Sequence, residues 1–109
     1  MKFLIRQYEI DPALHQPTVI YVPQSATLLK VHSSNGEHVF AWFLIDADAV
    51  ANVKYDFYTV PSEWEVPPTH PIISKKKNVK YFNTVFIRDG EIVFHVFCSD
   101  PYLDTSTDK

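Results

Sequence analysis

The chain has 109 residues with a formal net charge of −3; 46% of the residues are apolar and 15% are aromatic. This length suits a single domain that buries about two thirds of its extended surface on folding. Only two glycines occur, which excludes the glycine-rich phosphate loops of dinucleotide-binding and Walker-type proteins, because each needs at least two in one short segment. The negative charge disfavours double-stranded nucleic acid as a partner.

Seven short strands are predicted, because β-branched and aromatic residues alternate with polar ones in runs that turn residues separate. In chain order they are residues 3–10, 18–22, 26–32, 38–45, 53–60, 79–87 and 91–98. Asn35-Gly36 and Asp89-Gly90 supply the positive φ values of tight turns, so two hairpins are expected around them. Without a helix-length amphipathic segment, the fold is predicted to be all-β, either a small antiparallel sandwich or a partly open barrel.

The domain is expected to span residues 1–98, followed by a polar tail over 99–109. Residues 61–78 form one long loop whose four prolines predict neither a helix nor a strand. Ordered loops longer than about 12 to 15 residues commonly carry a function, so this loop is the first place to look for a site.

The strand over 91–98 is apolar on both faces, with Phe94 and Val96 on one face and Val93 and Phe97 on the other. One domain covers one of these faces. A partner subunit is therefore expected over the other, and the sequence predicts self-association.

Location follows from the cysteine count and from hydropathy. The single cysteine, Cys98, cannot form an internal disulfide, which fits a reducing cytoplasm. No apolar run approaches the roughly 18 residues of a membrane span, and the run after Met1 is too short for a signal peptide. The sequence therefore predicts a soluble, unexported protein without a membrane partner.

Several separated motifs resemble, in their order and approximate spacing over most of residues 3–97, a family of small uncharacterised phage and prophage proteins. The motifs are Val22 to Val31, Asn35-Gly36, Trp42 to Asp46, Thr69 to Ile72, Tyr81, Thr84-Val85 and Val93 to Phe97. This resemblance implies a phage-encoded protein that works in the cytoplasm of the bacterial host. It implies no catalytic or ligand residues.

Catalytic and metal sites are not predicted. The five histidines lack the spacing of known zinc motifs. Cys98 has no neighbouring histidine or lysine that would lower its pKa, and no serine lies in a nucleophile-elbow motif. We therefore expect no enzyme, no cofactor and no metal.

The candidate binding residues surround the long loop. The lysine cluster and a nearby aromatic ring are suited to a phosphorylated ligand, although adjacent lysines more often form a solvated loop. His70 and His95 either make structural hydrogen bonds or line a shared pocket near Tyr81 or Trp42. Trp64 is either an exposed interaction anchor or a lid on the core. The candidates are Trp64, His70, Lys75, Lys76, Lys77, Lys80, Tyr81 and His95.

The favoured hypothesis is a non-enzymatic binding protein that acts on a host component as a counter-defence or host-takeover inhibitor, because blocking a target needs surface complementarity and no chemistry. One alternative is a sponge that sequesters a phosphorylated nucleotide signal between subunits. Another is a minor structural or assembly protein of the virion. The least favoured is a small hydrolase that uses His70 and His95.

Overall fold

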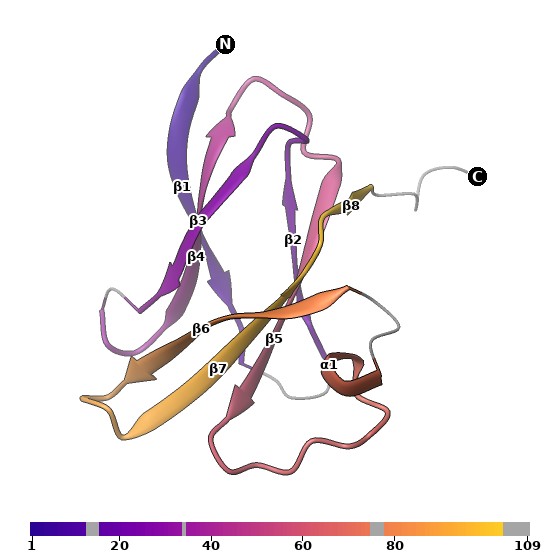
Figure 1. Cartoon of the computed structure of the whole chain (residues 1–109). Coiled ribbons are helices and arrows are strands. Elements are labelled where there is room, and N and C mark those ends of the chain that lie inside the picture. The colour runs from indigo at the N-terminus through magenta and orange to yellow at the C-terminus, as the bar shows by residue number, and fades with distance from the viewer. Residues whose placement is uncertain (13–15, 34, 75–77, 104–109) are drawn as a thin grey trace.

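The computed structural model describes residues 1–12, 16–33, 35–74 and 78–103, and they form two antiparallel sheets packed as a β-sandwich (Figure 1). The three-stranded sheet has the order β1 (Phe3–Ile10), β4 (Val39–Asp46), β3 (Thr27–His32). The five-stranded sheet has the order β2 (Thr18–Val22), β5 (Val53–Pro61), β7 (Ile92–Ser99), β6 (Val79–Ile87), and β8 (Tyr102–Leu103) also pairs with β5. The sandwich prediction is confirmed. The sheets do not close into a barrel.

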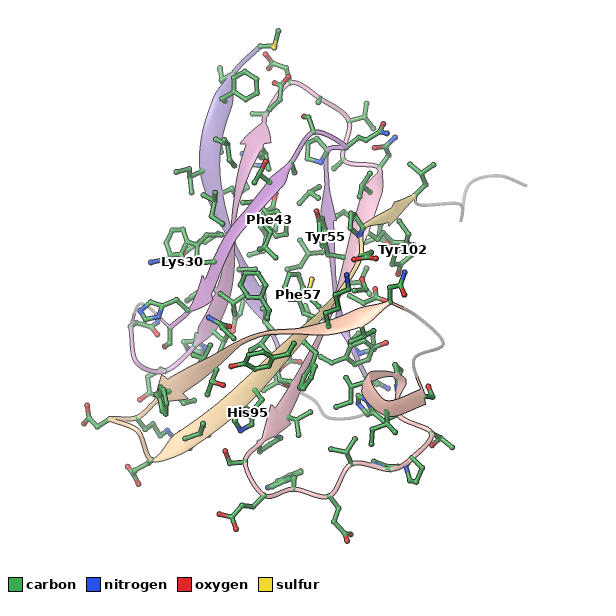
Figure 2. All side chains as sticks on the ribbon, in the orientation of Figure 1. Lys30, Phe43, Tyr55, Phe57, His95 and Tyr102 are labelled. Atoms are coloured by element: carbon green, nitrogen blue, oxygen red, sulfur yellow. The ribbon has the colours of Figure 1, made fainter. Side chains whose placement is uncertain are left out.

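The core lies between the sheets, where alternate side chains of each strand meet. Phe43 of β4 is fully buried, and its ring lies 5.6 Å from Tyr8, 5.1 Å from Tyr55 and 6.3 Å from Phe57 between centroids. Figure 2 shows Phe43, Tyr55 and Phe57 together in the space between the sheets. Both faces of β4 carry apolar side chains, as suits a central strand, and β4 lies between β1 and β3.

Both predicted hairpins are present, and their tips contact each other. Gly36 and Gly90 have φ values of 76° and 88°, and Arg88 and Asp89 are also in the left-handed region at 51° and 55°. The Arg88 amide donates a hydrogen bond to the Gly36 carbonyl at 2.8 Å. The Arg88 guanidinium lies 3.5 Å from the Glu37 carboxylate. The two turns therefore help to hold the sheets together at one end of the sandwich.

A second link between the sheets comes from a bulge in β6. The register of β6 against β7 shifts between Tyr81 and Asn83. The Asn83 side-chain amide donates to the backbone carbonyl of Val31 in β3 at 2.6 Å. The bulge thus lets a polar side chain reach across to the other sheet.

The long loop contains one helical turn, α1 (Pro71–Ser74), so the prediction that its prolines exclude a helix is wrong at this point. Proline is tolerated at the first helical position because the amide it lacks would have no intrahelical acceptor there. The carbonyl of His70 accepts the amides of Ile73 and Ser74, each at 2.9 Å. Among the described residues, no helix is long and apolar enough to span a membrane.

The chain past residue 98 also differs from the predicted polar tail. Ser99 still belongs to β7, and Tyr102 and Leu103 pair with Lys54 and Val53 as β8, an eighth strand. The turn residues Asp100 and Pro101 precede this short strand and interrupt the strand pattern in the sequence. Residues 104–109 lie outside the described part of the chain.

Candidate binding surfaces

A chain of hydrogen bonds crosses the outer face of the five-stranded sheet and includes two of the predicted residues, His95 and Tyr81. His95 Nε2 lies 2.8 Å from Ser62 Oγ, and His95 Nδ1 lies 3.0 Å from Thr84 Oγ1. Thr84 Oγ1 in turn lies 2.6 Å from the Tyr81 hydroxyl. Thr84 and His95 face each other in the register of β6 and β7, so ordinary strand pairing brings them together.

The partners in this series of hydrogen bonds favour a structural role for His95. Both ring nitrogens of His95 are paired with hydroxyl groups, whereas catalytic serine–histidine sites usually place a carboxylate behind the ring to stabilise the imidazolium that forms. A hydroxyl can donate or accept a hydrogen bond, so each ring nitrogen of His95 has a suitable partner. They tie Ser62, at the start of the long loop, to the sheet.

The turn after β5 directs Trp64 outward. The Ser62 amide donates to the Val93 carbonyl at 3.1 Å, and the Trp64 amide donates to the Pro61 carbonyl at 3.3 Å. Glu63 adopts a φ of 66° between them, in the left-handed region that non-glycine residues seldom occupy. Trp64 is 62% exposed, which is the arrangement required of an interaction anchor.

His70 belongs to a different group from His95. It is only 4% exposed, and its ring meets the Tyr58 ring edge-on at 5.3 Å. Its Nδ1 accepts the amide of Ile72 at 3.2 Å. His70 therefore packs α1 against β5, and the contacts of His95 are with Ser62 and Thr84 instead.

The structure describes only one of the four lysines in the predicted basic cluster. Lys80 is exposed on β6, next to Tyr81, whose hydroxyl is bonded to Thr84. Lys75, Lys76 and Lys77 lie outside the described residues. A phosphate site on these lysines stays a prediction.

The sequence did not indicate the apolar groove on the outer face of the three-stranded sheet, which has a volume of about 350 Å³. It is lined by Ile5, Leu29, Lys30 and Trp42. Ile5 and Leu29 are 59% and 45% exposed, and Phe3 and Leu44 are exposed beside them. Strand register explains the grouping, because Ile5 pairs with Leu44, and Lys30 pairs with Trp42.

One positive charge stands in this groove. The Lys30 ammonium lies 6.0 Å from the centroid of the Trp42 ring, and Figure 2 shows Lys30 on the side of its sheet that faces away from the core. Within the described residues, Lys30 has no ion pair, and the buried Nε1 of Trp42 has no hydrogen-bond partner. The groove therefore combines aliphatic walls, an aromatic ring and an ammonium group that lacks an anion.

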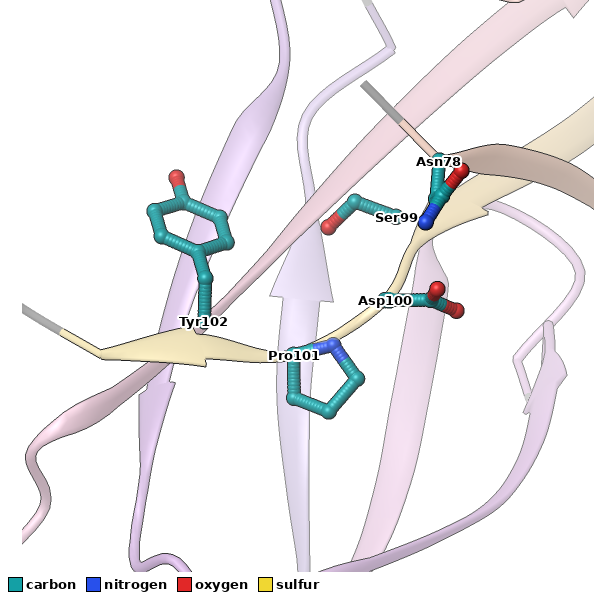
Figure 3. A pocket seen from close by; sticks show the side chains of 5 residues that line it. All are labelled: Asn78, Ser99, Asp100, Pro101 and Tyr102. Atoms are coloured by element: carbon teal, nitrogen blue, oxygen red, sulfur yellow. The ribbon is translucent and has the colours of Figure 1, made fainter.

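A second hollow lies at the connection between β7 and β8 and has a volume of about 390 Å³ (Figure 3). It is lined by Asn78, Ser99, Asp100, Pro101 and Tyr102. The Tyr102 hydroxyl donates to Asp56 Oδ1 at 2.6 Å, and Ser99 Oγ accepts the Asp56 amide at 2.9 Å. Because these two hydroxyls are engaged within the fold, the hollow is a weaker candidate than the groove.

Comparison with known families finds a match over most of the chain. The model of one family, described as a domain of unknown function (DUF7352), matches residues 1–104. No curated protein and no solved structure matches the chain.

Proposed function

The chain belongs to the DUF7352 family, and from this premise we propose that it is a phage-encoded protein that binds a host protein and inhibits it without catalysis. The proposal rests on the exposed apolar face of the three-stranded sheet around the groove. The phage origin and the action in the host cytoplasm rest on the resemblance of the separated motifs to phage and prophage proteins.

The composition of this face supports docking to another protein. Phe3, Ile5, Leu29 and Leu44 are all exposed on it, and contiguous exposed apolar patches of about 300 to 600 Å² often mark functional surfaces. Stable interfaces place apolar and aromatic residues in the centre and polar groups at the rim. The groove with Trp42 provides such a centre.

Polar pairs lie at both ends of the same face. The His38 ring lies 3.1 Å from the Glu9 carboxylate at one end of β1, and the N-terminal amine lies 3.8 Å from the Asp48 carboxylate at the other. These groups resemble the polar rim of an interface. Because β1 pairs with β4 without a break from Phe3 to Ile10, the face is preorganised, and little conformational entropy is lost on binding.

The proposal is tested by affinity capture from infected host cells with the wild type, Ile5→Asp and Trp64→Asp. Both substitutions add a carboxylate at an exposed apolar position, so both variants should fold, which circular dichroism verifies. A host protein retained by the wild type and by Trp64→Asp, but lost with Ile5→Asp, supports docking through the three-stranded sheet. Undiminished capture by Ile5→Asp overturns it, and loss with Trp64→Asp alone assigns the docking surface to the long loop.

Self-association is proposed for the opposite side of the sandwich. Tyr81 and Phe86 are exposed on the outer face of β6, beside the half-buried Val93 and Phe97 of β7. A second copy of the chain would cover these side chains. Sedimentation of the wild type above the monomer mass, lost in Phe86→Glu, supports this assignment, whereas a monomeric wild type contradicts it.

A further inference from the structure

The chemistry of the groove narrows the kind of partner that it can take. Resting on the proposed function, we propose that the groove of Ile5, Leu29, Lys30 and Trp42 recognises an acidic apolar segment of the partner protein. In such a segment aliphatic side chains occupy the groove, and a neighbouring aspartate or glutamate pairs with Lys30.

The size and the walls of the groove select the aliphatic side chain. The volume of about 350 Å³ corresponds to roughly twelve water molecules at about 30 Å³ each. Ile5, Leu29 and the Trp42 ring offer these waters few hydrogen bonds. Replacing them with aliphatic side chains of the bound segment is therefore favourable.

The charge in the groove selects the acidic neighbour. Lys30 is the positive group that lines it, and it forms no ion pair with any described residue. Of the acidic residues on the paired strands, Glu9 pairs with His38, and Asp46 Oδ1 accepts the amides of Lys2 and Asp48. A carboxylate from the partner would thus meet an uncompensated ammonium group, and a lysine or arginine there would be repelled.

The surroundings of the groove also favour a protein segment over a small molecule. Pockets for small ligands bury about 70 to 90% of the ligand surface. Here Ile5 and Leu29 are themselves about half exposed, and Phe3 and Leu44 continue the apolar surface past the groove. A partner that covers the whole face buries these side chains, whereas a small molecule in the groove leaves them in water.

The test uses Trp42 fluorescence in a Trp64→Phe background, because the chain has two tryptophans. Two peptides of about eight residues are titrated at low salt, one alternating leucine with glutamate and one alternating leucine with lysine. We expect the glutamate peptide to bind about tenfold more tightly, and added salt to reduce the difference, because a partly exposed ion pair is screened.

Variants of two lysines make the result specific to the groove. Lys30→Gln should abolish the preference for the glutamate peptide, and Lys30→Glu should reverse it. The matched control is Lys54→Gln, because Lys54 also lies beside aromatic rings, 5.8 Å from Tyr21 and 5.3 Å from Tyr102, but on the five-stranded sheet. The control should keep the preference.

Equal binding of the two peptides by the Trp64→Phe protein, or a preference that survives in Lys30→Gln, overturns the inference. The peptide titration and the affinity capture test the acidic-segment specificity and the proposed function independently. Loss of a host protein with Ile5→Asp but no peptide preference leaves the proposed function standing and refutes the acidic-segment specificity. A clear preference without any host protein that depends on Ile5 supports the specificity and refutes the host target.

Discussion

The hydrogen bond between Tyr102 and Asp56 should stabilise the C-terminal end of the five-stranded sheet. Asp56 is 1% exposed, and its Oδ1 accepts the Tyr102 hydroxyl at 2.6 Å. A hydrogen bond to a charged group contributes about 1.5 to 3 kcal/mol. Tyr102 is 37% exposed as a residue, so water can replace part of the lost contact in Tyr102→Phe. We expect this variant to lose about 1.5 to 2 kcal/mol of unfolding free energy.

Urea unfolding followed by circular dichroism measures this loss. The m-value should stay the same and the midpoint should fall, because the substitution changes stability and not compactness. Tyr21→Phe is the matched control, because Tyr21 lies on the neighbouring strand β2 and its hydroxyl has no hydrogen bond among the described residues. Its expected change is within about 0.5 kcal/mol. A loss below about 0.5 kcal/mol in Tyr102→Phe would refute the reasoning.

The same bond predicts a pH dependence. Burial, followed by the hydrogen bond to Asp56, raises the pKa of Tyr102 above its ordinary value of 10. Above pH 10 the unfolded chain therefore releases this proton more readily than the folded chain, and stability falls as the pH rises. Tyr102→Phe should lose less stability than the wild type over this alkaline range.

Three further predictions concern other parts of the fold. Burial raises the pKa of the Cys98 thiol from 9.0 to about 12. Between these pH values the unfolded chain releases the thiol proton first, so the free energy of unfolding falls by up to about 1.4 kcal/mol per pH unit. In Cys98→Ala the free energy of unfolding should therefore fall less steeply with pH over this range. Gly36→Ala should lower the free energy of unfolding by about 1 to 2 kcal/mol, measured in urea. Gly36 has a φ of 76°, and a Cβ added there would meet no atom within 4 Å, so backbone strain accounts for the whole loss. A loss near zero would contradict this explanation. Ser62→Ala removes a hydroxyl 2.8 Å from His95 and should speed amide exchange of the 62–64 turn while the core amides stay protected, and unchanged exchange there would show that the contact does not hold the loop.

Local sequence features predicted most of the strands because they depend on neighbouring residues alone. The positive φ values at Gly36 and Gly90 follow from turn chemistry, and the alternation along β4 separates buried Phe43 from Trp42 on the other face. The helical turn α1 was missed because Pro71 is tolerated only at the first position. The strand β8 was missed because two residues are too short to show alternation.

The candidate surface was only partly predictable. Tyr81 and His95 were singled out as site residues, and their connection through Thr84 depends on the register between β6 and β7. The groove could not be predicted from the sequence, because β1 and β3 are separated in the chain and come together only by pairing with opposite edges of β4. The bulge between Leu28 and Lys30 further disguised the alternation of β3.

The sequence by itself determined that this protein is an all-β domain with two glycine hairpins, because turn chemistry and a period of two residues act over a few neighbours. Only the tertiary structure decided that the hairpin tips join through Arg88 and Gly36, and that Ile5, Leu29 and Trp42 share one outer face. The physical reason is that contacts between distant segments depend on strand order and register, which the packing of the two sheets selects as a whole.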